Sequence, residues 1–251
     1  MLYGLLFHLI AIVVLSCKEA PQPNYLLKEP KIITDEKVNH LVWDSLLKQF
    51  VDGNGFVNYK GFKTEELRLT NYLQSLAKHP PQNNWTKDES IAYYINAYNA
   101  HTIKLILDNY PISSIKDIRN PWDQKRVQIG NNILSLGEIE HEVLRKMNEP
   151  RIHFAINCAS FSCPKLRYEA FIAKKLEEQL EIACKDFIND SSKNKLQNSE
   201  AQLSKIFKWY KSDFTENVSL IEYINRYAYA KISNDAKIRF LEYDWSLNEK
   251  P

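Results

Sequence analysis

The sequence predicts an α+β fold, a helix-rich single domain with a small, mainly antiparallel sheet and a buried central helix. Residues 91–107 carry apolar and aromatic side chains on nearly every face, which is typical of a helix inside a core. Residues 151–157 alternate between apolar and other side chains, which is the two-residue period of a strand. We therefore expect the buried helix to pack on the sheet that carries residues 151–157.

The composition excludes several classes of function. The chain has 251 residues, enough for one domain with a well-buried core. Its 33 Lys and Arg residues nearly balance its 31 Asp and Glu residues, so the net charge of +2 does not indicate a nucleic-acid partner. It has six glycines and no glycine-rich phosphate loop. We predict no cofactor, and a small molecule or peptide of unidentified chemistry as the ligand.

The first residues predict export and lipid attachment. Residues 2–16 are almost wholly apolar, and this run is shorter than the roughly 20 residues that a spanning helix needs. A serine precedes Cys17, which resembles the lipobox of bacterial lipoproteins, although no lysine or arginine precedes the run. We predict a signal peptide at residues 1–16, a tether at residues 17–34 that begins with lipidated Cys17, and the folded domain at residues 35–251.

This prediction places the chain in the bacterial cell envelope, held on a membrane by its N-terminal lipid anchor. The outer membrane and the cell surface are both compatible with it. Plain secretion and an uncleaved anchor are the alternatives.

Two helices and a turn are expected at the start of the domain. The first helix covers residues 35–50 and has one apolar stripe: Val38, Leu41, Val42, Leu46 and Phe50. Asp52 and Asn54 lie among glycines, but the later ligands of a calcium loop are missing, so a turn is the better interpretation. A short strand at residues 56–59 and a helix at residues 64–77 follow.

A capping box opens the central helix. The hydroxyl of Thr86 and the carboxylate of Glu89 are placed to bond free backbone N–H groups of the first turn. The helix also carries Asn96, Asn99 and His101. A buried amide without a partner costs about 1 to 3 kcal/mol, so each amide must bond either a backbone group or a ligand.

The next segment predicts a hairpin and another capped helix. Residues 126–134 form two short apolar runs around a glycine-bearing turn. Ser135 and Glu138 form a second capping box, which starts a helix that reaches about residue 147.

Two polar residues of this helix are candidates for a site. Glu140 lies within the apolar face of the helix, and His141 lies at the edge of that face. A buried carboxylate needs a partner or has a raised pKa. Arg151 on the predicted strand is the expected partner.

The predicted strand leads into a loop that carries thiols. Residues 158–163 are small, hydroxyl-bearing or thiol-bearing apart from one phenylalanine, and Pro164 ends the run. Cys158, Cys163 and the imidazole of His153 are thereby brought near one another. A rigid element that delivers a reactive loop is a common arrangement at active sites.

The remainder of the chain predicts packing elements. Residues 168–190 are expected to be helical with a bend near residues 171–174, and Cys184 falls on the apolar stripe. Residues 203–214 are rich in aromatic side chains, residues 218–230 are helical in pattern, and residues 238–245 are strand-like. We assign no chemical role to Asp213 or Asp244.

The motifs as a set resemble the domain-of-unknown-function 547 family. They extend over about residues 42–248 and are Trp85, residues 89–100, residues 136–141, residues 151–160 with Pro164, residues 203–210, Asp213 with Phe214, and Tyr243 with Asp244 and Trp245. The family occurs as bacterial lipoproteins and as domains in plant and nematode proteins, some of them fused to glutaredoxin-like and other signalling domains, and the resemblance implies no established activity.

The resemblance also marks positions in this chain. The motif positions that it carries over are Asn96, Asn99, Glu140, His141, Arg151, His153 and Cys158. In plant-like members the position of Cys163 looks like a serine, so the resemblance does not imply a shared disulfide.

The first functional hypothesis is a thiol-dependent hydrolase or acyl transferase. Cys158 is its candidate nucleophile, His153 or His141 its base, and Glu140 the group that orients the base. The substrate-binding candidates are Asn96, Asn99 and Arg151. One difficulty is that residues 153 and 158 point to opposite faces of a straight strand.

Two other hypotheses compete with the enzyme. A disulfide between Cys158 and Cys163 could be structural or redox-active and would contribute roughly 2 kcal/mol. The polar cluster could also belong to a non-enzymatic module that binds a ligand or partner. A metal site formed by His141, His153 and Cys158 is not predicted, because no recognised ligand spacing supports it.

Overall fold

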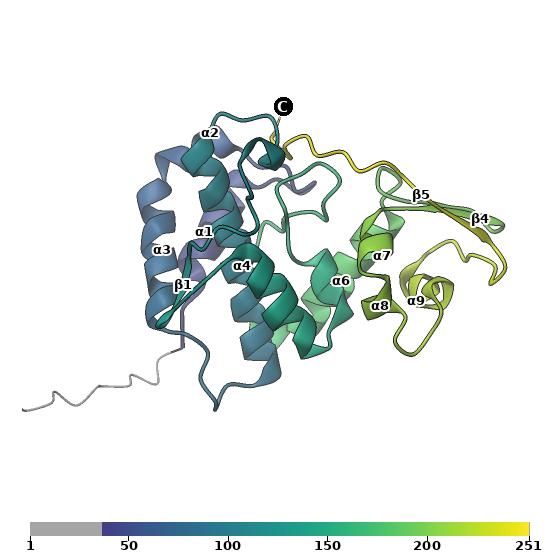
Figure 1. The fold of residues 1–251 in the computed structure, drawn as a ribbon, viewed down its shortest axis with the longest axis horizontal. Helices are drawn as coiled ribbons and strands as arrows, with labels where there is room; N and C mark the ends of the chain where they lie inside the picture. The colour runs from purple at the N-terminus through teal and green to yellow at the C-terminus, as the bar shows by residue number, and fades with distance from the viewer. Residues whose placement is uncertain (1–36, 251) are drawn as a thin grey trace, which may run out of the picture. The chain divides into compact units, whose positions relative to one another are not determined.

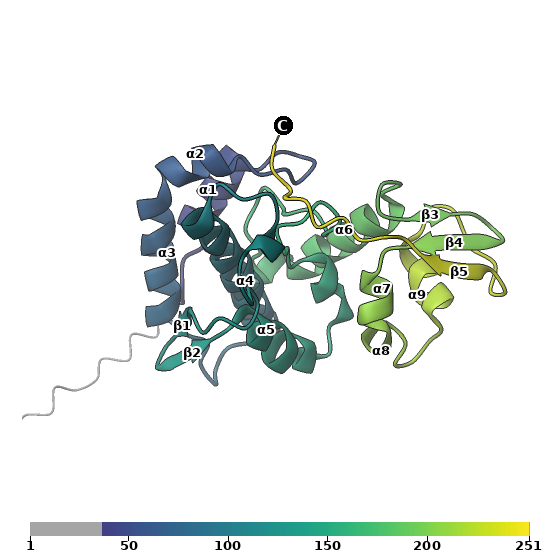
Figure 2. The ribbon, with the colours of Figure 1, turned by 45° about the horizontal axis from the view of Figure 1, so that its top comes forward.

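The structure, a computed structural model, describes residues 37–250. It confirms the helix-rich α+β class, with helices making up most of the secondary structure beside two small sheets (Figures 1 and 2). The predicted signal peptide, Cys17 and the tether lie outside the described residues. Within residues 37–250, no helix is long and apolar enough to cross a membrane.

The elements follow one another along the chain in a regular order. The helices of the first half are α1 (Leu41–Phe50), α2 (Tyr59–Thr64), α3 (Glu66–Lys78), α4 (Lys87–Asn109), η1 (Ile115–Asp117), α5 (Leu136–Glu138), η2 (Ile139–Leu144), η3 (Arg145–Met147) and η4 (Pro150–Phe154). The later helices are η5 (Ala173–Lys175), α6 (Leu176–Asn189), α7 (Ile206–Trp209), α8 (Lys211–Phe214) and α9 (Leu220–Tyr227). The strands are β1 (Val127–Ile129), β2 (Asn132–Leu134), β3 (Lys195–Leu196), β4 (Glu200–Leu203) and β5 (Lys237–Phe240).

Helix α4 is the centre of the first half of the domain. The capping box is present, since Thr86 Oγ1 accepts from the N–H of Glu89 at 3.2 Å and a Glu89 oxygen accepts from the N–H of Thr86 at 2.9 Å. The helix packs against α2, α3, η2 and η5, and nearly all of its residues after the first turn are buried. This confirms the predicted buried central helix.

Helix α1 is shorter than predicted and is turned differently. It begins at Leu41, and Leu41 and Val42 are exposed. Its buried face consists of Trp43, Leu46, Leu47 and Phe50. The large ring of Trp43 stacks on Tyr72 at 5.9 Å and sets the inward face, which the apolar stripe alone did not reveal.

The predicted hairpin and second capping box are both present. Strands β1 and β2 pair antiparallel, and Ser135 with Glu138 caps α5. The helix continues to Met147, but it widens to π geometry at η2 and tightens to 3₁₀ geometry at η3. Such π-helical segments inside helices are frequent at functional sites, and η2 carries Glu140 and His141.

The predicted strand at residues 151–157 is wrong, and so is the expectation that the buried helix packs on a sheet carrying these residues. The segment begins as the 3₁₀ helix η4, with Pro150 in its first turn and a Glu149 oxygen accepting from the N–H of Arg151 at 3.1 Å. All of residues 152–157 are buried, so the apolar alternation did not mark one exposed and one covered face. Local capping and burial on all sides override the strand pattern here.

The second half of the domain is built around α6 and a mixed sheet. Helix α6 packs against η4 and α9, and it begins later than predicted, because residues 168–172 are not helical. Strands β3 and β4 pair antiparallel, whereas β4 and β5 pair parallel, with Leu203 opposite Phe240. An aromatic core fills the space between them, and Cys184 is buried in it as predicted.

The C-terminal segment joins the two halves. After β5 it runs back toward α2, as the yellow end of the ribbon shows in Figures 1 and 2. Leu247 bridges to Ser160, and Glu249 bridges to Val57. The segment therefore lies along the loop that carries the two cysteines.

Candidate functional site

One cavity collects four of the predicted site residues. It has a volume of about 360 Å³ and is lined by Glu140, His141, His153 and Cys158, among others. These side chains come from η2, η4 and the loop after η4. Because residues 151–157 do not form a strand, the geometric objection to a shared site for residues 153 and 158 falls away.

Aromatic side chains form a large part of the cavity wall. Trp122, Trp209, Tyr210, Tyr243 and Trp245 all line it. The indoles of Trp209 and Trp245 lie 5.9 Å apart, and the ring of Tyr243 lies 4.5 Å from Trp245 and 4.8 Å from Trp209. Apolar walls with a few converging polar groups are typical of ligand sites.

His153 is held firmly at the edge of this cavity. Its Nε2 lies 2.9 Å from Oδ2 of Asp213, and its ring stacks on Tyr210 at 3.9 Å. A carboxylate that accepts from Nε2–H leaves the lone pair of a neutral imidazole on Nδ1. Within the described chain, Nδ1 of His153 has no hydrogen-bond partner.

Asp213 is in turn fixed by an arginine fork. Arg145 Nε and Nη2 each donate to one oxygen of Asp213 at 2.7 Å. The Arg145 guanidinium, helped by His153 and Ser212, holds the pKa of the Asp213 carboxyl well below its usual range. The result is a rigid Arg145, Asp213 and His153 chain that ends at the cavity.

Glu140 is buried in the cavity wall with few partners. The hydroxyl of Tyr98 donates to Oε2 at 3.5 Å, and Nδ1 of His153 lies 3.8 Å from Oε1. Burial, and then the charge of Glu140, raises the pKa values of the Tyr98 and Tyr210 hydroxyls, which therefore stay protonated. The predicted ion pair between Glu140 and Arg151 is wrong, because Arg151 pairs with Glu149 and Glu177 at 2.7 Å.

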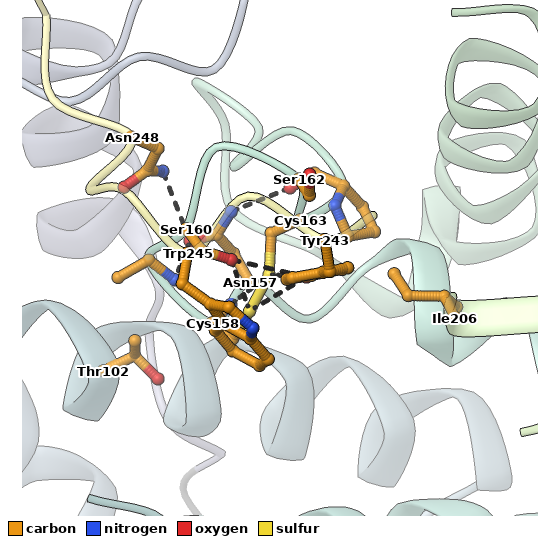
Figure 3. The surroundings of a disulfide bond; sticks show 12 residues. Thr102, Asn157, Cys158, Ser160, Ser162, Cys163, Ile206, Tyr243, Trp245 and Asn248 are labelled. Carbon is orange, nitrogen blue, oxygen red and sulfur yellow. Dashed lines mark hydrogen bonds between the residues drawn. A yellow bond between two sulfur atoms is a disulfide. The ribbon is translucent and has the colours of Figure 1, made fainter. Parts of the chain in front are cut away.

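Cys158 and Cys163 form a disulfide (Figure 3), and both residues line the cavity. The hydroxyl of Tyr243 lies 3.3 Å from each sulfur, and the backbone N–H of Cys158 donates to Sγ of Cys163 at 2.8 Å. Cys158 is partly exposed, whereas Cys163 is buried. The two sulfurs thus differ in access and in hydrogen bonding.

The loop between the cysteines is also held by backbone hydrogen bonds. The N–H groups of Phe161 and Ser162 donate to Ser246 and Asp244 carbonyls at 2.7 and 3.1 Å. Asn157 Nδ2 donates to the Pro164 carbonyl at 2.7 Å and closes the loop from inside. The disulfide is therefore one of several constraints on this loop.

A second cavity of about 490 Å³ borders the other side of the same loop. Its charged residues include Lys165, Lys185, Lys193 and Asp190, and none of its lining residues is a histidine or glutamate. Lys193 donates to the Phe161 carbonyl and lies 3.9 Å from the centroid of its ring. The smaller cavity is the better candidate site, because it contains the imidazole and the carboxylate.

The two buried amides of α4 are tied to backbone groups, and neither residue lines this cavity. Asn96 accepts from the N–H of Phe171 at 3.0 Å and donates to its carbonyl at 2.7 Å. Asn99 accepts from the N–H of Asn157 at 2.8 Å and donates to the Ala155 carbonyl at 3.0 Å. These contacts match the structural alternative considered for both residues.

The other two polar candidates lie near the surface. His141 is exposed, and its Nδ1 lies 3.3 Å from Nη1 of Arg145. Arg151 does not line the cavity, and its guanidinium is occupied by two carboxylates. His101 is buried on α4, and burial lowers its pKa to about 3.

Sequence reasoning missed several residues of the site. Asp213 is 60 positions away from its partner His153, and Tyr98, Trp122 and Tyr243 come from three further segments. The sequence signals for Asp213 were its place in an aromatic run beside Phe214 and among the motifs of the family resemblance, and neither indicated a chemical role. Among residues 37–250, no three His, Cys, Asp or Glu side chains are grouped as metal ligands.

Comparison with known proteins gives one family. Residues 82–188 match the sequence model of the family described as "Protein of unknown function, DUF547". This supports the predicted resemblance over a segment that contains Glu140, His141, His153 and both cysteines of the disulfide. No curated protein and no solved structure matches the chain.

Proposed function

We propose that this chain, whose residues 82–188 match the DUF547 family, is a thiol-dependent acyl-transfer enzyme, either a hydrolase or an acyl transferase. One observation carries the proposal: Cys158 lines the same aromatic cavity as a histidine that a carboxylate orients. A nucleophile and a base that a third group fixes are the shared elements of covalent catalysis in many folds.

The proposal assigns a role to each of these side chains in the cavity. His153 takes the proton of the Cys158 thiol on Nδ1, and Asp213 and Glu140 stabilise the imidazolium that forms. The thiolate adds to the acyl carbon, the bond to the leaving group breaks, and the leaving group receives the proton from the imidazolium. Water or another acceptor then cleaves the thioester and restores the thiol.

The disulfide is the oxidised resting form in this proposal. Two molecules of a small thiol would reduce the bond between Cys158 and Cys163 to two thiols. The two small thiols would themselves be oxidised to a disulfide. The backbone hydrogen bonds of Phe161 and Ser162 and the side-chain hydrogen bond of Asn157 support a loop that keeps its shape after reduction. Exposed disulfides are the ones that thiols reach, and Cys158 is partly exposed.

The first test is the reactivity of Cys158 in a Cys163→Ser variant, which frees the thiol without a reductant. We expect rapid iodoacetamide labelling with an apparent pKa well below about 8.5. His153→Ala should slow labelling at neutral pH by about tenfold, whereas His141→Ala, at an exposed position, should change it little.

The second test is direct detection of the acyl-enzyme. The Cys163→Ser variant is incubated with small aryl esters and thioesters, and mass spectrometry locates the added acyl group. Acylation of Cys158 that His153→Ala slows supports the enzyme. A thiol that reacts no faster than a denatured control would contradict the proposal and leave the cavity as a non-enzymatic binding site.

Thiol–disulfide exchange is a second candidate. It is favoured by the hydrogen bonds to Sγ of Cys163 from the Cys158 N–H and the Tyr243 hydroxyl, which would stabilise a departing thiolate. The Cys163→Ser variant separates the two candidates. Acyl transfer should persist in this variant, whereas catalysed disulfide exchange should be lost.

We also propose export and lipid attachment at Cys17, which place the reaction in the bacterial cell envelope. The apolar run at residues 2–16 and the serine before Cys17 support this proposal. Metabolic labelling with a fatty acid in a bacterial host tests it. The label should appear on the full chain and disappear in Cys17→Ser, and an unlabelled, freely secreted wild-type protein would contradict it.

A further inference from the structure

The charge balance of the aromatic cavity indicates the class of ligand. Glu140 is 6% exposed and lines the cavity, and within residues 37–250 it forms no ion pair with a lysine or arginine. Its neighbours are hydroxyl donors such as Tyr98 and the imidazole of His153. A buried carboxylate without a cation is unfavourable unless a ligand supplies one.

Two of the other charged groups near the cavity, Asp213 and Arg145, compensate each other. Asp213 is neutralised by the two-point contact of Arg145. His153 is neutral when it acts as the base, and in this respect the inference rests on the proposed function. The carboxylate of Glu140 then leaves a net negative charge facing the cavity.

The walls favour a cation as well. Electron-rich ring faces attract ammonium groups within about 6 Å of the centroid. Lys116 Nζ already lies 4.8 Å from the Trp245 centroid, and Cζ of Arg145 lies 5.5 Å from that of Tyr210. In the described part of the chain, no lysine or arginine lies over Trp122, Trp209 or Tyr243, so their faces are not taken by the protein's own cations.

The volume limits the size of the ligand. A cavity of about 360 Å³ is near the lower end of the range for small-molecule sites. It suits an ammonium group on a short apolar body, either a free amine or the side chain of a lysine. We infer that the thiol site takes a cationic, ammonium-bearing substrate, with Glu140 as its counter-ion and the indole rings around it.

The experiment compares three probes of similar size on the oxidised protein, in which the disulfide prevents acylation. These are hexylammonium, hexan-1-ol and hexanoate, and binding is followed by calorimetry and by the fluorescence of the cavity tryptophans. We expect hexylammonium to bind about tenfold or more tightly than hexan-1-ol, and hexanoate to bind most weakly.

Variants assign the preference to Glu140. Glu140→Gln should reduce the preference for the amine over the alcohol to about twofold or less, while Glu140→Asp should keep part of it. Glu142→Gln is the matched control, because Glu142 is an exposed carboxylate two positions away. Circular dichroism confirms that each variant is folded, and the aspartate variant serves if the glutamine variant is not.

The outcomes separate this inference from the proposed function. Equal binding of amine and alcohol, or an amine preference that survives in Glu140→Gln, overturns the cationic ligand even if Cys158 proves reactive. Amine selectivity without thiol reactivity leaves the ligand class standing and overturns the enzyme. An Nα-acetyl-lysine amide probe then distinguishes a lysine side chain, which it mimics, from a free amine.

Discussion

The amides of helix α4 and the polar groups of the aromatic cavity are both buried, yet they are bonded very differently. Asn96 and Asn99 each use an amide oxygen and an amide nitrogen on backbone groups at 2.7 to 3.0 Å. Glu140 and His153 approach each other at 3.8 Å, and Nδ1 of His153 has no partner within the described residues.

This difference separates a structural role from a chemical one. An amide whose oxygen and nitrogen both bond backbone groups stabilises the fold and does not need a ligand to satisfy it. A buried group with free capacity is costly to the fold, and such groups occur at functional sites. Four substitutions test the contrast, and they follow in order of expected effect on the free energy of unfolding.

Asn96→Ala should be the most destabilising change, by about 3 kcal/mol. It leaves the buried N–H and carbonyl of Phe171 without partners, each at a cost of about 1 to 3 kcal/mol. Urea denaturation measures the loss. Asn109→Ala is the control, because Asn109 is exposed and its amide bonds within the same helix, so it should cost less than about 1 kcal/mol. Similar losses for the two variants would contradict a special role for Asn96.

Cys163→Ser should cost about 2 kcal/mol. The disulfide closes a short loop, and its removal restores that much chain entropy to the unfolded state. Because other hydrogen bonds also hold the loop, the cavity should stay intact. The affinities for hexylammonium, hexan-1-ol and hexanoate should therefore change by less than about twofold. Loss of probe binding together with the disulfide would show that the cavity wall depends on the bond.

Asp213→Asn should cost about 1.5 kcal/mol at neutral pH, with a clear dependence on pH. The folded-state pKa of Asp213 lies well below the unfolded value of about 3.9, chiefly because of Arg145. Its stabilisation is therefore fully present above about pH 5 and is lost as the pH falls through and below the unfolded pKa. The difference between the unfolding free energies of the wild type and the variant should shrink steadily as the pH falls below about 5, and a constant difference would contradict the ion pair.

Glu140→Gln should have the smallest effect, between no change and a gain of about 1 kcal/mol. The substitution removes a buried charge that has no lysine or arginine partner among residues 37–250. Thermal denaturation of Glu140→Gln measures this effect. The control Glu142→Gln should change the free energy of unfolding by no more than about 0.5 kcal/mol. A loss of more than about 2 kcal/mol would place Glu140 with the structural amides of α4.

The sequence by itself determined the features that depend on neighbouring residues. Two capping boxes, the hairpin and the burial of α4 follow from side chains within a few positions of one another. The same local reasoning was wrong at residues 151–157, because apolar alternation is ambiguous when every side is covered. It also misplaced the inward face of α1, where the indole of Trp43 decides the packing.

Only the tertiary structure decided the candidate site. It brought Asp213 to His153 across 60 positions, turned Arg151 away from Glu140 toward Glu149 and Glu177, and joined the two cysteines. The cavity wall comes from segments between residues 98 and 245. The periodicity of a sequence indicates which face of a helix or strand is covered. Ion pairs, disulfides and cavities depend on which distant elements cover that face, and this is decided only when the whole chain packs.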